Sequence, residues 1–232
     1  MKKIAFFVEG QTERIFIEKL IEEYYSYPDY DIISSQLKSN RLMTVRRRRK
    51  KDAVEYLFIV IDASCDTRVL SAIKERADTL YEAGVSRIFG IRDLFPGKKT
   101  DEQIILENVN RVIMDIKSRD IITFIIAVME IEAWFLTDID LFKRINPQLT
   151  ADRINEQVSI DITDTEKYPH PARIIDSIFQ LVNLRYKKRE KDVYKIANYL
   201  DYENIFCNNK IRGANKSFEL FLDHFEGIAD VY

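Results

Sequence analysis

Four apolar stretches of the chain each lead to an acidic residue, and this repeated pattern constrains the fold more than any other feature of the sequence. Continuous apolar stretches are typical of strands that are buried on both faces of a parallel sheet. In open sheets of this kind, ligands bind beyond the carboxyl ends of the strands. The stretches Phe6–Val8, Phe58–Ile61, Ile88–Ile91 and Ile125–Met129 lead to Glu9, Asp62, Asp93 and Glu130. We therefore expect the four acids to gather where a divalent metal ion would bind.

Strand and helix signals alternate through the first 140 residues. Parallel strands need crossovers of a dozen or more residues, which are usually helical. The alternation therefore predicts an α/β fold with a mostly parallel, Rossmann-like sheet flanked by helices. The expected strands are Lys3–Val8, Asp31–Leu37, Tyr56–Ile61, Arg87–Ile91 and Ile121–Met129.

The pattern changes after residue 140. The remaining residues carry helical signals, tyrosines and basic clusters such as Arg185–Arg189, and no Gly/Ser linker separates them from the rest. A segment without such a linker is expected to pack on its neighbour instead of hanging free. We therefore predict an α/β domain over residues 1–140 and an α-helical C-terminal extension over residues 141–232.

Composition limits the classes of protein to which the chain can belong. Its 232 residues are 46% hydrophobic, enough for a full core, and its net charge is −2. Any affinity for nucleic acid must therefore come from local patches. Cys65 and Cys207 show no zinc or disulfide spacing, which fits a reducing cytoplasm. The first acid comes too early for a signal peptide, and no stretch approaches the roughly 18 apolar residues of a membrane span, so we expect a cytoplasmic protein with no membrane contact.

Glu9 stands at the first turn from a strand to a helix. Gly10 permits a tight turn there, and the amides at the start of the next helix favour anions. Glu9 is thus a candidate metal ligand, although an acid in one such turn can also be incidental. Residues 10–12 lack the Gly-Lys-Ser/Thr ending of a P-loop, and the chain contains no G-x-G-x-x-G motif.

Asp62 and Asp66 form the second candidate site. Two carboxylates four residues apart on a turn from strand to helix can share Mg²⁺, which binds a few carboxylates and completes its octahedron with water and substrate oxygens. Asp66 has an alternative role, because an aspartate at this position can cap the following helix.

The third and fourth candidate ligands are Asp93 and Glu130. Arg92 and Asp93 could instead form a structural ion pair. Glu130 and Glu132 occupy alternate positions if the strand continues but would diverge by about 200° on a helix, so we expect at most one of them to face a shared site. Trp134 is most simply a core anchor.

A run of six cations gives the strongest charge signal in the chain. Six consecutive cations repel one another, so we expect an exposed loop. The loop could hold a phosphate backbone or could simply be solvated. The run consists of Arg46, Arg47, Arg48, Arg49, Lys50 and Lys51. Because it interrupts a domain with an acidic site, which would itself repel a polyanion, we favour nucleic-acid binding.

The stretch from Val8 to Glu13, Val-Glu-Gly-Gln-Thr-Glu, followed by a later strand that ends on Asp62, resembles the TOPRIM domain of topoisomerases, primases and OLD-family nucleases. The chain is also similar to uncharacterised bacterial TOPRIM-like proteins that carry Gly-x-Arg-Asp-x-x-Pro and Glu-x-Glu-Ala-Trp-Phe-Leu segments, here residues 90–96 and 130–136. The resemblance covers roughly residues 1–136. It implies that Glu9 is a metal ligand or general acid/base and that Asp62 begins an Asp-x-Asp pair. The chain has Ser64 at the second position of that pair, so Asp66 or Asp93 would have to supply the missing ligand.

These features together predict a Mg²⁺- or Mn²⁺-dependent phosphodiester hydrolase, a nuclease acting on DNA or RNA that could serve bacterial defence. The catalytic residues would be Glu9 and Asp62, and the metal ligands would be Glu9, Asp62, Asp66, Asp93 and Glu130. The alternative is a catalytically degenerate TOPRIM-like module that binds nucleic acid, a nucleotide or a partner protein, with Ser64 marking lost catalysis. A small-molecule phosphotransferase would need a nucleotide site that the sequence does not show.

Overall fold

The computed structural model describes residues 1–25, 30–39, 41–48 and 54–228. Two compact units make up the chain, and each is formed from two separate stretches. The first unit comprises Met1–Arg92 and Thr100–Ile126, and the second comprises Asp93–Lys99 and Ala127–Tyr232. The predicted site residues are therefore divided between the units.

A six-stranded sheet runs through the α/β part of the chain, in the order β3-β2-β4-β1-β5-β6. Strand β1 is parallel to β4 and β5, and β4 is parallel to β2, whereas β3 is antiparallel to β2. The predicted α/β class with a mostly parallel sheet is therefore confirmed. The strands are β1 (Lys2–Val8), β2 (Tyr30–Lys38), β3 (Arg41–Arg48), β4 (Tyr56–Asp62), β5 (Val85–Asp93) and β6 (Ile122–Ala127).

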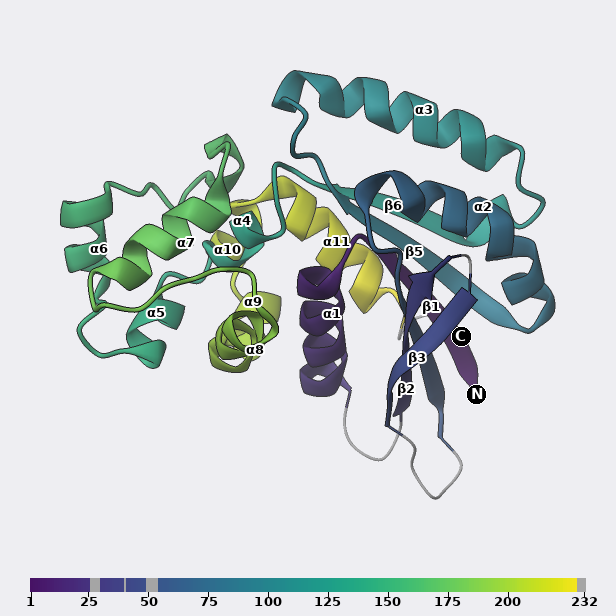
Figure 1. Ribbon diagram of the computed structural model, residues 1–232, viewed down its shortest axis with the longest axis horizontal. Coiled ribbons are helices and arrows are strands. Elements are labelled where there is room, and N and C mark those ends of the chain that lie inside the picture. The colour runs from purple at the N-terminus through teal and green to yellow at the C-terminus, as the bar shows by residue number, and fades with distance from the viewer. Residues whose placement is uncertain (26–29, 40, 49–53, 229–232) are drawn as a thin grey trace. The chain divides into compact units, whose positions relative to one another are not determined.

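Helices cover both faces of this sheet. Helix α1 packs on one face, where Tyr25 at its end lies 4.9 Å from the ring of Phe58 between centroids. Helix α2 lies on the other face (Figure 1). The helical elements of the first unit are α1 (Gln11–Tyr24), α2 (Asp66–Glu82), α3 (Glu102–Met114) and the short turn η2 (Arg119–Ile121), and a further short turn, η1 (Lys99–Asp101), begins at the last residue of a second-unit stretch.

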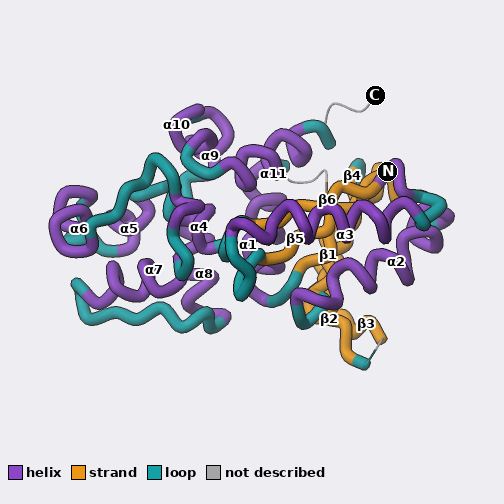
Figure 2. The backbone as a smooth tube through the Cα atoms, turned by 90° about the horizontal axis from the view of Figure 1, so that it is seen from above, coloured by secondary structure: helices purple, strands orange, loops and turns teal. Residues whose placement is uncertain are grey.

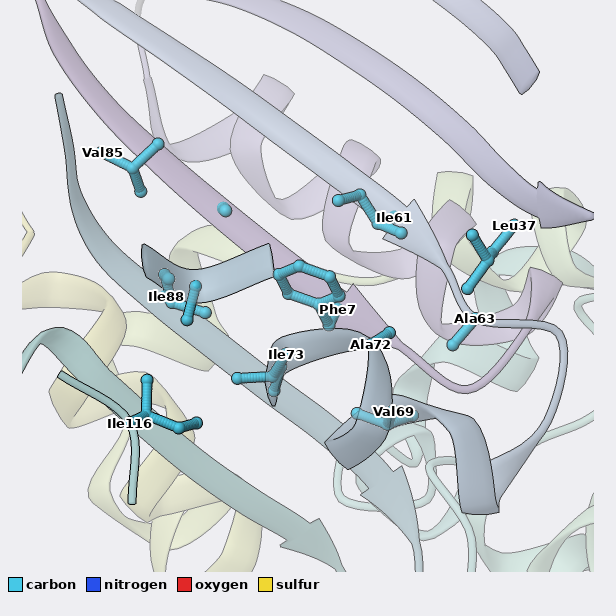
Figure 3. Close-up of a cluster of buried hydrophobic side chains, with 12 residues drawn as sticks. Phe7, Leu37, Ile61, Ala63, Val69, Ala72, Ile73, Val85, Ile88 and Ile116 are labelled. Atoms are coloured by element: carbon cyan, nitrogen blue, oxygen red, sulfur yellow. The ribbon is translucent and has the colours of Figure 1, made fainter. Parts of the chain in front are cut away.

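The core beneath α2 is made by alternate residues of the strands. Phe7 of β1 and Ile61 of β4 are register partners, so their side chains emerge on the same face of the sheet. Val69 and Ile73 of α2 are fully buried against this face (Figure 3). The continuous apolar strands in the sequence thus reflect burial on both sides of the sheet.

Strand β3 replaces the loop that we expected for the first cations of the basic run. The run lacks the apolar alternation of a half-buried strand, yet residues 41–48 pair with β2, with a register shift at Val45. The reason lies in the position of β3 at the edge of the sheet, where exposed residues such as Leu42 and Val45 need no core face. Charged residues are common on edge strands because they discourage pairing with other chains. Residues 49–51 lie outside the described part of the chain.

The second unit is helical, as predicted for the C-terminal region. After β6, the described residues form helices and loops without a further strand (Figure 2). The fully buried Trp134 stacks on Phe218 and Phe221 of α11, with ring centroids 5.0 and 5.2 Å away, so its predicted place in a core is confirmed. The helical elements are α4 (Glu132–Phe135), α5 (Asp140–Ile145), α6 (Ala151–Val158), η3 (Thr165–Lys167), α7 (Pro171–Gln180), α8 (Glu190–Tyr199), α9 (Tyr202–Cys207), α10 (Asn209–Gly213) and α11 (Lys216–Glu226).

The close packing of α2 on the sheet can be tested by a substitution at Gly90 of β5. A Cβ atom at this position would lie 2.6 Å from Cδ1 of Ile73 and 2.5 Å from Cδ2 of Phe124. Gly90→Ala should therefore lower the free energy of unfolding by about 1–3 kcal/mol, as overpacking does in other cores. Gly213→Ala is the matched control, because nothing lies within 4 Å of its Cβ position, and it should raise stability by about 0.5 kcal/mol. Urea denaturation measures both, and equal stability of Gly90→Ala and the parent would contradict the packing described.

Candidate metal centre

The turn after β6 brings two glutamates to one place. Met129 has a left-handed backbone with φ of 67°, which non-glycine residues adopt rarely. Its carbonyl oxygen accepts a hydrogen bond of 2.7 Å from the amide of Phe95, which fixes the turn. Helix α4 begins only at Glu132, so Glu130 and Glu132 share neither a strand nor a helix. Both side chains belong to one carboxylate cluster, so the expectation that at most one of them faces a shared site is wrong.

Asp93, Glu130 and Glu132 form a carboxylate cluster within the second unit. One side-chain oxygen from each residue lies within 4.8 Å of the other two. The residues are almost inaccessible, with exposed fractions of 6%, 8% and 0%. The amide of Ile131 donates a hydrogen bond of 2.9 Å to Oδ1 of Asp93, so the turn that carries the glutamates also positions the aspartate.

Two residues from the loop before α8 complete the cluster. The Tyr186 hydroxyl donates a hydrogen bond of 2.9 Å to Oε1 of Glu132. Nζ of Lys188 donates to Oε1 of Glu130 at 2.7 Å and lies 3.0 Å from Oε2 of Glu132. The amide of Ala172, in the first turn of α7, donates to Oε2 of Glu130 at 3.3 Å. The helix dipole of α7 adds positive potential there.

The charges in the cluster do not balance. Burial raises the pKa of the Glu132 carboxyl; Lys188 opposes that rise and Glu130 adds to it. Burial by itself would lower the pKa of Lys188, but Glu132, Asp93 and Glu130 together outweigh burial and raise it. Lys188 therefore stays protonated at neutral pH. If all three carboxylates were ionised, they and one ammonium would carry two negative charges in excess, the charge that a divalent cation neutralises.

A cavity of about 360 Å³ in the second unit is lined by residues that adjoin the cluster in sequence. Met129 in its wall precedes Glu130, and His170 lies two residues before Ala172. The ring of His170 meets that of Phe95 edge to face, with centroids 5.3 Å apart. The wall of the cavity is therefore close in sequence to Glu130 and to Ala172, whose amide donates to Glu130.

Asp62, which the sequence suggested as a catalytic residue, is buried at the end of β4 in the first unit. Its Oδ1 accepts a hydrogen bond of 2.8 Å from the amide of Ser64, and its Oδ2 accepts one of 3.4 Å from Nε2 of Gln36. Burial raises the pKa of Asp62, although the Ser64 amide and the charge of Arg14 act against the rise. Ser64 has φ of 69°, so Asp62 stabilises a strained turn between β4 and α2.

Glu9 and Asp66 also belong to the first unit. Strands β1 and β4 are parallel neighbours, so Glu9, which follows β1, and Asp62, the last residue of β4, lie at the same end of the sheet. The capping role considered for Asp66 is wrong, because the N-cap of α2 is Cys65. Oδ2 of Asp66 instead lies 3.4 Å from Nη2 of Arg92. Among the described residues of this unit, no three acids, histidines or cysteines bring ligand atoms within 4.8 Å of one another.

The basic run contributes Arg46 to an ion-pair network on α1. Nη1 of Arg46 lies 2.7 Å from Oε2 of Glu18, and Nη2 lies 3.4 Å from Oε1 of Glu22. Arg14 pairs with the other oxygen of the buried Glu18 at 2.8 Å. Much of the charge of Arg46 is therefore neutralised within the protein.

The sequence alone did not point to Glu132, Tyr186 or Lys188 as site residues. The spacing of Glu130 and Glu132 was visible, but it pointed to divergent side chains because the left-handed turn at Met129 carries no glycine signal. Lys188 lies within a noted basic cluster, but no sequence motif links that cluster to an acid more than fifty positions earlier.

The chain matches a known protein family. A family model described as "Domain of unknown function (DUF4276)" matches residues 8–225. The chain belongs to the DUF4276 family. In this DUF4276 chain, the matched segment takes in Asp93, Glu130, Glu132 and Lys188. No curated protein and no solved structure gave a significant match. None of the helices in the described part of the chain is long and apolar enough to cross a membrane.

Two aspartates of this DUF4276 chain should have opposite effects on its pH-dependent stability. The pKa of Asp62 is raised, so ionisation opposes folding as pH increases above the ordinary aspartate value of about 3.9. Asp62→Asn should match the parent at low pH and be more stable at neutral pH without metal. The pKa of Asp78 is lowered by hydrogen bonds from Ser118, so its contribution is present above that value and is lost as pH falls.

Asp78→Asn is therefore the control of opposite sign, and it should be less stable than the parent at neutral pH only. Urea denaturation in EDTA at about pH 3.5 and about pH 7 measures both differences. A destabilised Asp62→Asn variant at neutral pH would contradict the account of this buried carboxyl.

Proposed function

We propose that this protein is a divalent-metal-dependent phosphodiester hydrolase that acts on DNA or RNA, with Mg²⁺ or Mn²⁺ held by Asp93, Glu130 and Glu132. The observation that carries the proposal is the buried set of three carboxylate oxygens within 4.8 Å of one another. Oxygens on opposite sides of an octahedral Mg²⁺ are about 4.2 Å apart. The cluster would therefore need only a small contraction to enclose the ion.

The electrostatics of the cluster favour a site for a divalent cation over a purely structural set of ion pairs. Burying several acids is costly unless their charges are compensated, and one ammonium compensates only one of three. Burial raises the pKa of Glu132, and the negative charge of Glu130 adds to the rise. A divalent ion would remove the excess.

Lys188 has two roles in this proposal. Without metal, its ammonium holds Glu130 and Glu132 together. With the ion on the carboxylates, the ammonium would be released toward a substrate phosphate, where it could neutralise charge as the phosphodiester is attacked. The ion itself would lower the pKa of a bound water and neutralise charge on the scissile phosphate.

The TOPRIM resemblance proposes a second set of catalytic residues, Glu9 and Asp62. The hydrogen bonds of Asp62 to its own turn favour a structural role for that residue, whereas the second unit offers three acids in one cluster. We therefore favour the Asp93 cluster as the metal site and use Glu9 and Asp62 to test the other assignment.

Metal binding should stabilise the protein through the cluster. Mn²⁺ at about one hundred times its Kd should raise the free energy of unfolding by about 2.7 kcal/mol, and EDTA should reverse the effect. Asp93→Asn and Glu130→Gln should lose most of this stabilisation, whereas Glu156→Gln, an exposed acid of the same unit, should keep it. Thermal and urea denaturation with and without Mn²⁺ provide the measurement.

Cleavage assays on the same variants show which residues the hydrolysis requires. Labelled single- and double-stranded DNA and RNA should be cleaved by the parent and by Glu156→Gln with Mn²⁺, and not by Asp93→Asn or Glu130→Gln. Lys188→Met should bind Mn²⁺ about tenfold more tightly by calorimetry, because a competing cation is gone, and should cleave poorly. Loss of cleavage in Glu9→Gln and Asp62→Asn with normal activity in Asp93→Asn would move the site to the first unit. If Mn²⁺ leaves the free energy of unfolding of the parent protein unchanged, the proposal is wrong.

A further inference from the structure

A second cavity of about 360 Å³ in the second unit is strongly basic. Its walls include five cationic side chains and one acid, and no aromatic residue. The charged lining residues are Arg185, Lys187, Arg189, Lys191, Lys195 and Asp192. A concave surface with this excess of positive charge attracts anions and concentrates them locally.

The cavity and the acid cluster share one short segment of chain. Tyr186 and Lys188 contact the carboxylates, whereas Arg185, Lys187 and Arg189, which alternate with them, line the basic cavity. Consecutive Cα atoms are only about 3.8 Å apart. An anion in the cavity would therefore lie beside the segment that presents Lys188 to the acids.

Hydrogen bonds hold this segment in place. Asp176 accepts from Nε and Nη2 of Arg185 at 2.9 and 2.8 Å and from the amide of Tyr186 at 2.8 Å. Asp192 accepts from the amide of Lys187 at 3.0 Å. The one acid in the cavity wall is thus engaged with the backbone, and the segment is ordered before any ligand arrives.

Three cations of the cavity are available to bind a ligand. Within the described part of the chain, Arg189, Lys191 and Lys195 have no acid within 4.0 Å. Lys191 and Lys195 are both exposed and stand one turn apart on α8, so they lie on the same side of the helix. Arg46 of the basic run, by contrast, is paired with two acids.

We propose that this basic cavity binds backbone phosphates of a polynucleotide and thereby positions the strand for the Asp93 cluster. The inference rests on the proposed function and names the part of the substrate that the second unit would hold. The lining offers cations for phosphates but no aromatic surface on which a base could stack, so the contact should be independent of sequence. Phosphate contacts of this kind fix the register of a strand relative to a catalytic site.

The test compares two variants that lose the same charge. Lys191→Gln/Lys195→Gln removes cavity cations, and Lys143→Gln/Lys210→Gln removes exposed cations of the same unit outside the cavity. Fluorescence anisotropy with labelled 20-nucleotide DNA and RNA, in EDTA, measures binding without cleavage. The cavity variant should bind about tenfold more weakly, with the log K against log salt slope reduced by about 1.4 for a single strand or about 1.8 for a duplex. The control should bind as the parent does.

The outcomes separate this inference from the proposed function. If Asp93→Asn binds the strand normally and no protein cleaves it, the hydrolase proposal fails while the phosphate site stands. If the cavity variant binds with the affinity and salt slope of the parent, the phosphate site is wrong. Pyrophosphate competition identifies the ligand: a parent that binds pyrophosphate but neither DNA nor RNA would also overturn the inference, because the cavity would then serve free polyphosphates.

Discussion

The contact of the Lys188 ammonium with two buried glutamates is the interaction on which the candidate site depends. Carboxylates at this separation repel one another strongly in a medium of low polarity, and without a cation they would protonate or move apart. Lys188 reaches Glu130 and Glu132 at 2.7 and 3.0 Å, and the hydroxyl of Tyr186 and the amide of Ala172 supply further donors. The loop before α8 and the first turn of α7 are thus joined to the turn after β6 through charge as well as through apolar packing.

The geometry of that turn explains why the acids converge. Strand β6 ends at Ala127, and the left-handed backbone of Met129 then turns the chain before α4 begins. Trp134, two residues beyond Glu132, donates from Nε1 to Oγ of Ser217 at 3.0 Å and is fully buried. The apolar anchor of α4 and the charged cluster therefore stabilise the same short segment. A strained backbone at such a position is common at functional sites, where the surrounding structure must hold it.

The sequence predicted the sheet better than the site. Apolar strands such as β1 and β4 could be recognised because burial on both faces leaves a continuous signal, and the helical C-terminal region followed from the loss of that signal. Strand β3 could not be recognised, because an edge strand rich in cations has no apolar pattern. Asp93 and Glu130 were predicted as metal ligands because they come after apolar stretches. Glu132 and Lys188 were not, since their convergence depends on a turn at a non-glycine residue and on a loop distant in sequence.

Diffraction from crystals soaked in Mn²⁺, recorded at a wavelength where manganese scatters anomalously, would show whether the Asp93 cluster binds a metal ion. The account predicts one anomalous peak within about 2.3 Å of carboxylate oxygens from Asp93, Glu130 and Glu132, with the Lys188 ammonium moved away from Glu130. A cluster with no peak, in which Lys188 keeps its contacts with both glutamates at saturating Mn²⁺, would contradict it. The ion pairs would then be structural, and the function of the second unit would have to lie elsewhere.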